Sequence, residues 1–137
     1  MSENIINRFN VLVKKAYYIY KRFGIESTFA LLYHKEPISV VDLSKFIRLS
    51  DHLIEVDENH YFIIFEFTSQ EDAYKASQNI IHNLDKHFNS CMGCFIAIDS
   101  FDVAKSPQNV LNRLKQILIQ VRKNPCVRVE VEDILDR

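Results

Sequence analysis

The chain has 137 residues, of which 47% are hydrophobic and 26% are charged, and its formal net charge is −1. This size and balance fit one domain, residues 1–137, with a hydrophobic core of its own. A net charge near zero gives no electrostatic basis for binding nucleic acid or an anionic membrane surface. No apolar run approaches the roughly 20 residues of a membrane span, and the Met-Ser-Glu-Asn start lacks the features of a signal peptide. We therefore expect a cytoplasmic protein with reduced cysteines.

Glycine is scarce, because only Gly24 and Gly93 are present. Phosphate-binding loops need several glycines, since their backbone N–H groups must approach the ligand without a Cβ in the way. The sequence therefore excludes P-loop and dinucleotide-binding fingerprints, and we expect no cofactor.

The first 23 residues predict a helix over 3–23, which Gly24 ends at the position that glycine favours. Its apolar side chains recur in steps of four and three, the spacing of a heptad seam. The seam consists of Ile5, Phe9, Leu12, Ala16, Ile19 and Phe23. A stripe of this kind either packs on its own domain or pairs two helices in a dimer. We expect these six residues to form an interaction surface, and the choice between packing within the chain and between chains stays open.

The next segments predict a strand at 29–33, a short helix at 41–49 and a β-hairpin. On the short helix, the candidates for the buried side are Val41, Phe46, Ile47 and Leu49. The hairpin has its strands at 53–56 and 61–67, joined by the polar break Asp57-Glu58-Asn59-His60. Its second strand is apolar at nearly every position, which is typical of a strand covered on both faces.

The second half of the chain predicts a helix that opens at Thr68 or Ser69, a buried strand at 94–98, and a helix with Ser106 as N-cap and Pro107 at its first position. A final strand over 126–131 alternates valines with charged residues, as an edge strand does. The whole order is a helix, then β-α-β-β-α-β, then α-β. We predict an α/β (α+β) protein with a ferredoxin-like core and a mainly antiparallel sheet of about five strands.

The hairpin region carries a family resemblance. Arg48-Leu49-Ser50-Asp51 precedes the hairpin as an Arg-x-x-Asp, and Glu58-Asn59-His60-Tyr61-Phe62 lies at its turn. These two segments resemble the inhibitory-site motif and the signature turn of the GGDEF (diguanylate cyclase) domain family. The resemblance covers residues 27–132 and implies a degenerate member that lacks the Gly-Gly-Asp-Glu-Phe signature.

The departures from the family pattern bear on activity. The resemblance implies two carboxylates, one on the first strand and one in the turn, that hold Mg²⁺ against GTP phosphates. Here the first strand ends in Tyr33-His34-Lys35, and the turn has Asn59 or His60 at its acidic position. The interval from His34 to Arg48 is too short for the guanine-binding helices that the family has there. We therefore expect no cyclase activity, and a signalling or protein-interaction role instead.

Two alternative functions remain. In the family, the Arg-x-x-Asp pair binds cyclic di-GMP, so Arg48 and Asp51 are candidate ligands for that nucleotide; otherwise they are surface residues at the end of a helix. Cys91 and Cys94 form a CxxC, which with His82, His87 or Cys126 would give a zinc site or a redox pair. The second pair of zinc ligands at the usual spacing is missing, and the motif precedes a strand instead of a helix. Buried structural cysteines fit these residues better.

Overall fold

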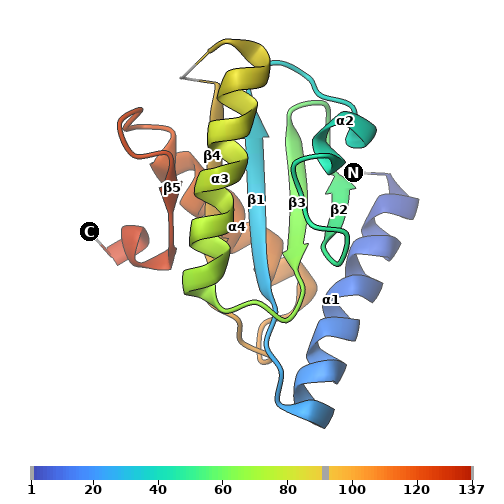
Figure 1. Cartoon of the computed structure of the whole chain (residues 1–137). Helices are drawn as coiled ribbons and strands as arrows, with labels where there is room; N and C mark the ends of the chain where they lie inside the picture. Colours follow the sequence, from blue (N-terminus) through green and yellow to red (C-terminus); the bar gives the residue numbers. More distant parts are fainter. Residues whose placement is uncertain (1, 91–92, 137) are drawn as a thin grey trace.

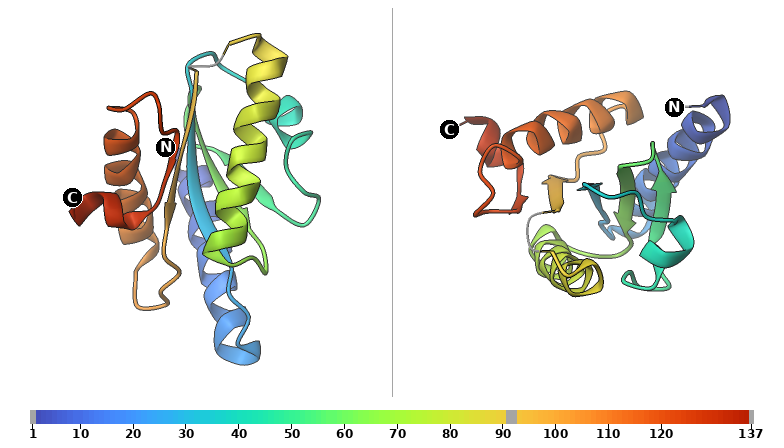
Figure 2. Two further views of the ribbon diagram at one scale, coloured as in Figure 1. Left: turned by 60° about the vertical axis from the view of Figure 1, so that its left-hand side comes forward. Right: turned by 90° about the horizontal axis from the view of Figure 1, so that it is seen from above.

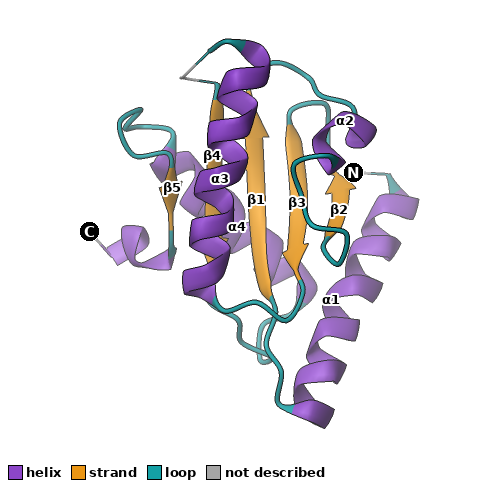
Figure 3. Ribbon diagram, in the orientation of Figure 1, coloured by secondary structure: helices purple, strands orange, loops and turns teal. Residues whose placement is uncertain are grey.

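The computed structural model describes residues 2–90 and 93–136. Its centre is a five-stranded sheet with the strand order β2-β3-β1-β4-β5 (Figures 1 and 3). The pairs β2–β3, β3–β1 and β1–β4 are antiparallel, and β4–β5 is parallel. The strands are β1 Thr28–His34, β2 His52–Glu55, β3 His60–Phe65, β4 Cys94–Asp99 and β5 Val129–Glu130. The predicted ferredoxin-like fold class and mainly antiparallel sheet are confirmed.

Serine side chains begin the four α-helices. In each, the hydroxyl of the N-cap serine accepts a hydrogen bond from the backbone N–H three residues later, which satisfies one of the free donors of the first turn. The helices are α1 Glu3–Phe23, α2 Val40–Ser44, α3 Gln70–Phe88 and α4 Pro107–Val121, and a 3₁₀-helix, η1, covers Glu132–Asp136. Gly24 ends α1 with φ 69°, the left-handed conformation predicted from the sequence.

Helices cover both faces of the sheet (Figure 2). On one face, α1 and α4 pack against side chains such as Phe29, Leu31 and Phe62. On the other face, α2 and α3 pack against Leu32, Ile63 and Ile96. Because neighbouring residues of a strand point to opposite faces, the apolar strands β1, β3 and β4 supply both cores at once.

The short helix differs from its prediction. It covers only Val40–Ser44, because Ser39 caps it and the backbone N–H of Lys45 already turns back to the Asp42 carbonyl. Leu43 is its buried residue, while Val41 and Leu49, two of the predicted buried residues, are exposed. Phe46 and Ile47, the other two, pack partly buried against the core but lie beyond the end of the helix. A helix of little more than one turn shows no complete apolar period in the sequence, so the prediction was wrong for Val41 and Leu49.

The last strand is shorter than predicted. Only Val129 and Glu130 pair with β4, and they do so in parallel. Asn124 holds the preceding residues in a turn, since its side-chain oxygen accepts from the N–H of Cys126 and its carbonyl accepts from the N–H of Val127. The predicted edge position is confirmed, because β5 is the last strand of the sheet. Across the described residues, no helix combines the length and the hydropathy needed to cross a bilayer.

Candidate functional site

The tip of the β2–β3 hairpin is a closed turn. The backbone N–H groups of Val56 and Asp57 both donate to the carbonyl of His60, at 2.8 and 3.3 Å. The Asp57 carboxylate accepts from the N–H of Asn59 and lies 2.8 Å from Nδ1 of His60. Partial burial of Asp57 opposes its ionisation, but these hydrogen bonds outweigh burial and lower the pKa of Asp57. The carboxylate is therefore engaged within its own turn.

Asn59 fastens this turn to the end of β1. Its side-chain Nδ2 donates to the carbonyls of His34 and Lys35, at 2.9 and 3.1 Å. The N–H of His34 donates in return to the Asn59 carbonyl at 2.9 Å. The resemblance to GGDEF domains places the carboxylates for Mg²⁺ at these two segments, and here an amide joins them directly. Within the described residues, no three His, Cys, Asp or Glu side chains are grouped to hold a metal ion.

His34 is buried at the same end of the sheet. Its side chain is packed on the ring of Phe88, with the ring centroids 4.5 Å apart, and the residue is 3% exposed. Its Nδ1 lies 2.8 Å from the carbonyl oxygen of Glu36 and 3.1 Å from the backbone nitrogen of the same residue. Desolvation lowers the pKa of His34, so the neutral imidazole is favoured. His34 therefore has a structural role and carries no charge near neutral pH.

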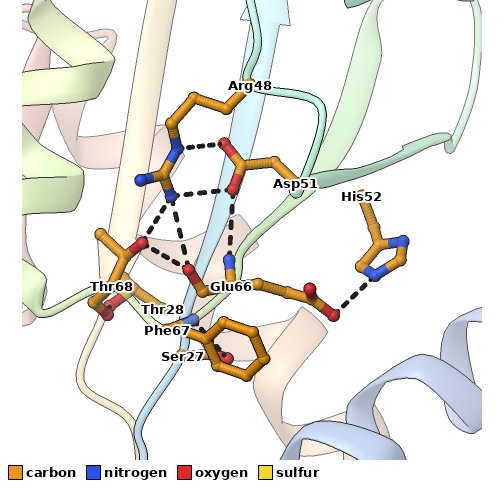
Figure 4. Close-up of polar contacts among 8 residues, drawn as sticks. All are labelled: Ser27, Thr28, Arg48, Asp51, His52, Glu66, Phe67 and Thr68. Atoms are coloured by element: carbon orange, nitrogen blue, oxygen red, sulfur yellow. Dashed lines mark hydrogen bonds and ion pairs between the residues drawn. The ribbon is translucent and has the colours of Figure 1, made fainter.

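The other end of the hairpin holds the Arg48–Asp51 pair (Figure 4). Nε and Nη2 of Arg48 donate to the two Asp51 oxygens at 3.0 and 2.8 Å, in a bidentate ion pair. Asp51 also accepts from the backbone N–H of Glu66 at 3.2 Å. The side chain of Asp51 is 1% exposed, and that of Arg48 is 52% exposed. The hydrogen bond to Asp51 raises the pKa of Arg48, which is charged throughout the physiological range.

Arg48 also braces the junction between β3 and α3. Its Nη2 donates to the Thr68 hydroxyl and to the Glu66 carbonyl, and the Thr28 hydroxyl donates to the Thr68 carbonyl. Between them, Phe67 has φ 54°, a left-handed conformation that is strained for a bulky residue. The Arg48 Nη1 has no hydrogen bond within the described part of the chain, and Figure 4 shows it turned away from these partners. One terminal nitrogen of the guanidinium is thus left for a ligand or for water.

The predicted stripe of α1 lies largely within the core of its own chain. Phe9 and Ala16 are buried, and the Phe9 ring meets the Phe62 ring edge-on with centroids 4.6 Å apart. Ile5 and Leu12 pack against the same core, and Ile19 is half-buried. Of the six, only Phe23 is exposed, at 63%. Packing within the chain therefore occupies Phe9 and Ala16, while Phe23 at the end of the helix is accessible.

Other apolar side chains of α1 face outward. Among the described residues, eleven large hydrophobic side chains are exposed, and six of them lie between positions 6 and 25. The most exposed on the helix are Val11, Tyr18 and Phe23. Val11 and Tyr18 are separated by seven residues and share one face of the helix. The predicted seam does not include Val11 and Tyr18, because a helix with apolar residues on several sides does not show in its sequence which side the sheet covers.

The cysteines do not assemble a site in the described structure. Cys94 is fully buried in β4, and burial raises the pKa of its thiol far above the ordinary value. Cys91, the other half of the CxxC, lies outside the described residues. Cys126 is exposed in the turn before β5, and His82 and His87 belong to α3. A buried, protonated Cys94 fits a structural role.

Solved structures with a similar fold include two GGDEF domains. The GGDEF domain of DgcB from Caulobacter crescentus, in complex with c-di-GMP, is similar with a TM-score of 0.75 and 10% identity, over 91% of this chain and 88% of that one. PA1120 (TpbB or YfiN) from Pseudomonas aeruginosa, in a mutant comprising only the GGDEF domain, gives a TM-score of 0.74 and 13% identity, over 95% and 90%. The sequence matches no family model and no curated protein. The chain has the fold of GGDEF domains.

Proposed function

We propose that this chain is a catalytically inactive domain of the GGDEF fold that works as a protein-interaction module, forming a dimer through the exposed apolar side chains of α1. The proposed absence of catalysis rests mainly on the side-chain amide of Asn59, whose hydrogen bonds join the hairpin tip to the end of β1. A nucleotide with its Mg²⁺ needs free carboxylates and open space there. In this chain His34 and Lys35 occupy the end of β1, and the Asp57 carboxylate is bound within the turn.

The exposed apolar side chains of α1 support the interaction role. Val11 is 63% exposed and Tyr18 is 60% exposed on the side of α1 that faces away from the core, and Phe23, at the end of the core-facing seam, is 63% exposed. Aromatic residues are enriched in protein interfaces because they bury a large area at a low entropic cost. A symmetric dimer places the same patch of both copies together. Anchoring by Phe9 and Val13 means that α1 presents this patch without leaving its own domain.

Sedimentation equilibrium tests the dimer. We expect the wild type to associate reversibly, and Tyr18→Asp combined with Phe23→Asp to be monomeric with an unchanged unfolding midpoint. Val41→Asp is the control, since Val41 is also exposed, at 71%, but lies on α2. A wild type that stays monomeric at every concentration contradicts the proposal, as does a control that dissociates to the same extent. Phe9→Asp is unsuitable, because it buries a carboxylate against Phe62.

A second function is favoured by one observation, the half-exposed guanidinium of Arg48. Asp51 holds it in a fixed orientation, and Nη1 has no hydrogen bond to the described residues. Such a fork binds phosphate or a guanine edge, which supports cyclic di-GMP as the ligand. Calorimetry with cyclic di-GMP separates this function from the first. Heat that is lost in Arg48→Ala and kept in Arg22→Ala supports the sensor, and no heat with the wild type excludes it.

A further inference from the structure

A groove of about 360 Å³ opens between α4 and the tip of the β2–β3 hairpin. Its apolar lining comes from Leu31 of β1, Val56 of the hairpin, and Leu118 and Ile119 of α4. Leu31 and Leu118 belong to the core that α1 and α4 share with the sheet. The volume lies within the range of small-molecule sites, roughly 300–1,000 Å³. An apolar lining of this kind accommodates an apolar body.

Two cations border this apolar lining. Lys115 of α4 and Arg122, the C-cap residue of that helix, lie seven residues apart and therefore on the same side of the helix. Neither forms an ion pair with an acid in the described residues. The Arg122 guanidinium stacks on the Tyr33 ring, 3.7 Å from its centroid, which limits its freedom and orients its donors. The groove thus has a positive rim that the chain itself does not neutralise.

The acid at the groove does not cancel that charge. Among the described lining residues, Asp57 is the only acid, and its carboxylate already lies 2.8 Å from Nδ1 of His60. The same carboxylate accepts from the N–H of Asn59 at 2.8 Å. His60 in turn lies beside Tyr33, with ring centroids 5.3 Å apart. The lining therefore pairs an apolar floor with two available cations and a carboxylate that is already engaged.

We propose that this groove binds a small amphipathic anion, an organic carboxylate whose apolar body packs on Val56 and Ile119, above the buried Leu31 and Leu118, and whose carboxylate meets Arg122 and Lys115. A charge-assisted hydrogen bond from guanidinium to carboxylate supplies orientation, and the apolar contacts supply most of the affinity. Val11, Tyr18 and Phe23 of α1 do not line the groove. The site is thus independent of dimerisation, and either property can fail without the other.

Calorimetry and amide chemical shifts with decanoate test the site, with decanol as the uncharged counterpart. We expect decanoate to bind, with shifts confined to the hairpin tip and to the second half of α4, and decanol to bind about tenfold more weakly. Equal binding of decanol contradicts the proposal, because the cations then contribute nothing. So does the absence of decanoate binding up to about 1 mM.

Variants on α4 locate the anion. Arg122→Ala is expected to weaken decanoate binding about tenfold, and Ile119→Asp to abolish it by placing a negative charge on the wall. Lys123→Ala is the matched control. Lys123 directly follows Arg122 and carries the same charge, but Lys123 does not line the groove. All three side chains are exposed, and an unchanged unfolding midpoint confirms the fold of each variant. A loss in Lys123→Ala as large as in Arg122→Ala overturns the site.

Discussion

The two ends of the β2–β3 hairpin hold similar polar residues and use them differently. At the tip, Asp57 and Asn59 direct their hydrogen bonds to the turn itself and to β1. At the base, Asp51 is buried and satisfied, but its partner Arg48 is half-exposed and keeps one terminal nitrogen free of contacts to the described residues. The polar groups at the tip are thus satisfied within the chain, while the base presents a half-exposed guanidinium. The tip is closed by hydrogen bonds within the chain, and the base exposes a positive charge.

The largest effect is expected at the base, from Asp51→Ala. The change removes a buried carboxylate that accepts from Arg48 and from the N–H of Glu66. Leaving these donors without an acceptor costs about 2–3 kcal/mol of the free energy of unfolding. Urea unfolding measures it. Asp51→Asn keeps one oxygen acceptor without the charge and should lose less. An unchanged free energy of unfolding in Asp51→Ala would show that this carboxylate does not hold the junction.

A smaller loss is expected at the tip, from Asn59→Ala. Two hydrogen bonds from Nδ2 to the carbonyls of His34 and Lys35 disappear, at a cost of about 1–2 kcal/mol. Unfolding in urea gives the difference, and amide exchange at residues 34–35 and 57–60 shows whether the turn opens. Asn59→Asp should lower the free energy of unfolding further, because a carboxylate would then face the two carbonyl oxygens to which the Asn59 amide donates. A neutral effect of both variants would mean that the tip is not closed by this side chain.

Relief of backbone strain is expected from Phe67→Asn. Phe67 is 57% exposed and has φ 54°, a conformation that asparagine tolerates far better than phenylalanine. The free energy of unfolding should rise by about 0.5–1 kcal/mol. Phe67→Val provides the contrast, since a β-branched residue should destabilise the same position. If asparagine destabilises as much as valine does, the Phe67 ring makes a contribution that outweighs the strain.

The smallest change is expected from pH. Burial lowers the pKa of His34, so the unfolded chain takes up a proton near pH 6.5 while the folded chain stays neutral. His34 therefore contributes its full stability above about pH 6.5, and this contribution is lost as the pH falls toward the folded pKa. Urea midpoints at pH 7.5 and 5.5 test this, with His34→Gln as the reference. A wild type that loses no more stability than His34→Gln contradicts it.

Most of the fold was predictable from the sequence, for identifiable reasons. Ser106-Pro107 and Gly24 mark helix ends by local chemistry, and the apolar run from Tyr61 to Phe65 indicates a strand covered on both faces. The short helix and the last strand were less predictable. In α2 a single turn carries no full period, and before β5 the Asn124 side chain holds a turn that alternating valines do not reveal.

The functional site was predictable only in part. The Arg-x-x-Asp spacing located Arg48 and Asp51, but their bidentate contact and the bond from Glu66 depend on β3 passing beside them. The periodicity of α1 identified an apolar stripe but did not show what this stripe packs against. In the structure Phe9 and Ala16 are buried against the sheet, and Tyr18 is exposed. The cation–π contact between Arg122 and Tyr33 joins two residues that are far apart in the sequence, so no local sequence pattern predicts it.

The most direct test of a closed hairpin tip is thermal unfolding with and without GTP and Mg²⁺. A ligand at 100 times its Kd adds roughly 2.7 kcal/mol to the free energy of unfolding, which shifts the midpoint by several degrees. The amide bridge from Asn59 to the end of β1 predicts no shift in the wild type. A clear upward shift with GTP and Mg²⁺ would contradict it, because the tip would then open to admit the nucleotide and its metal.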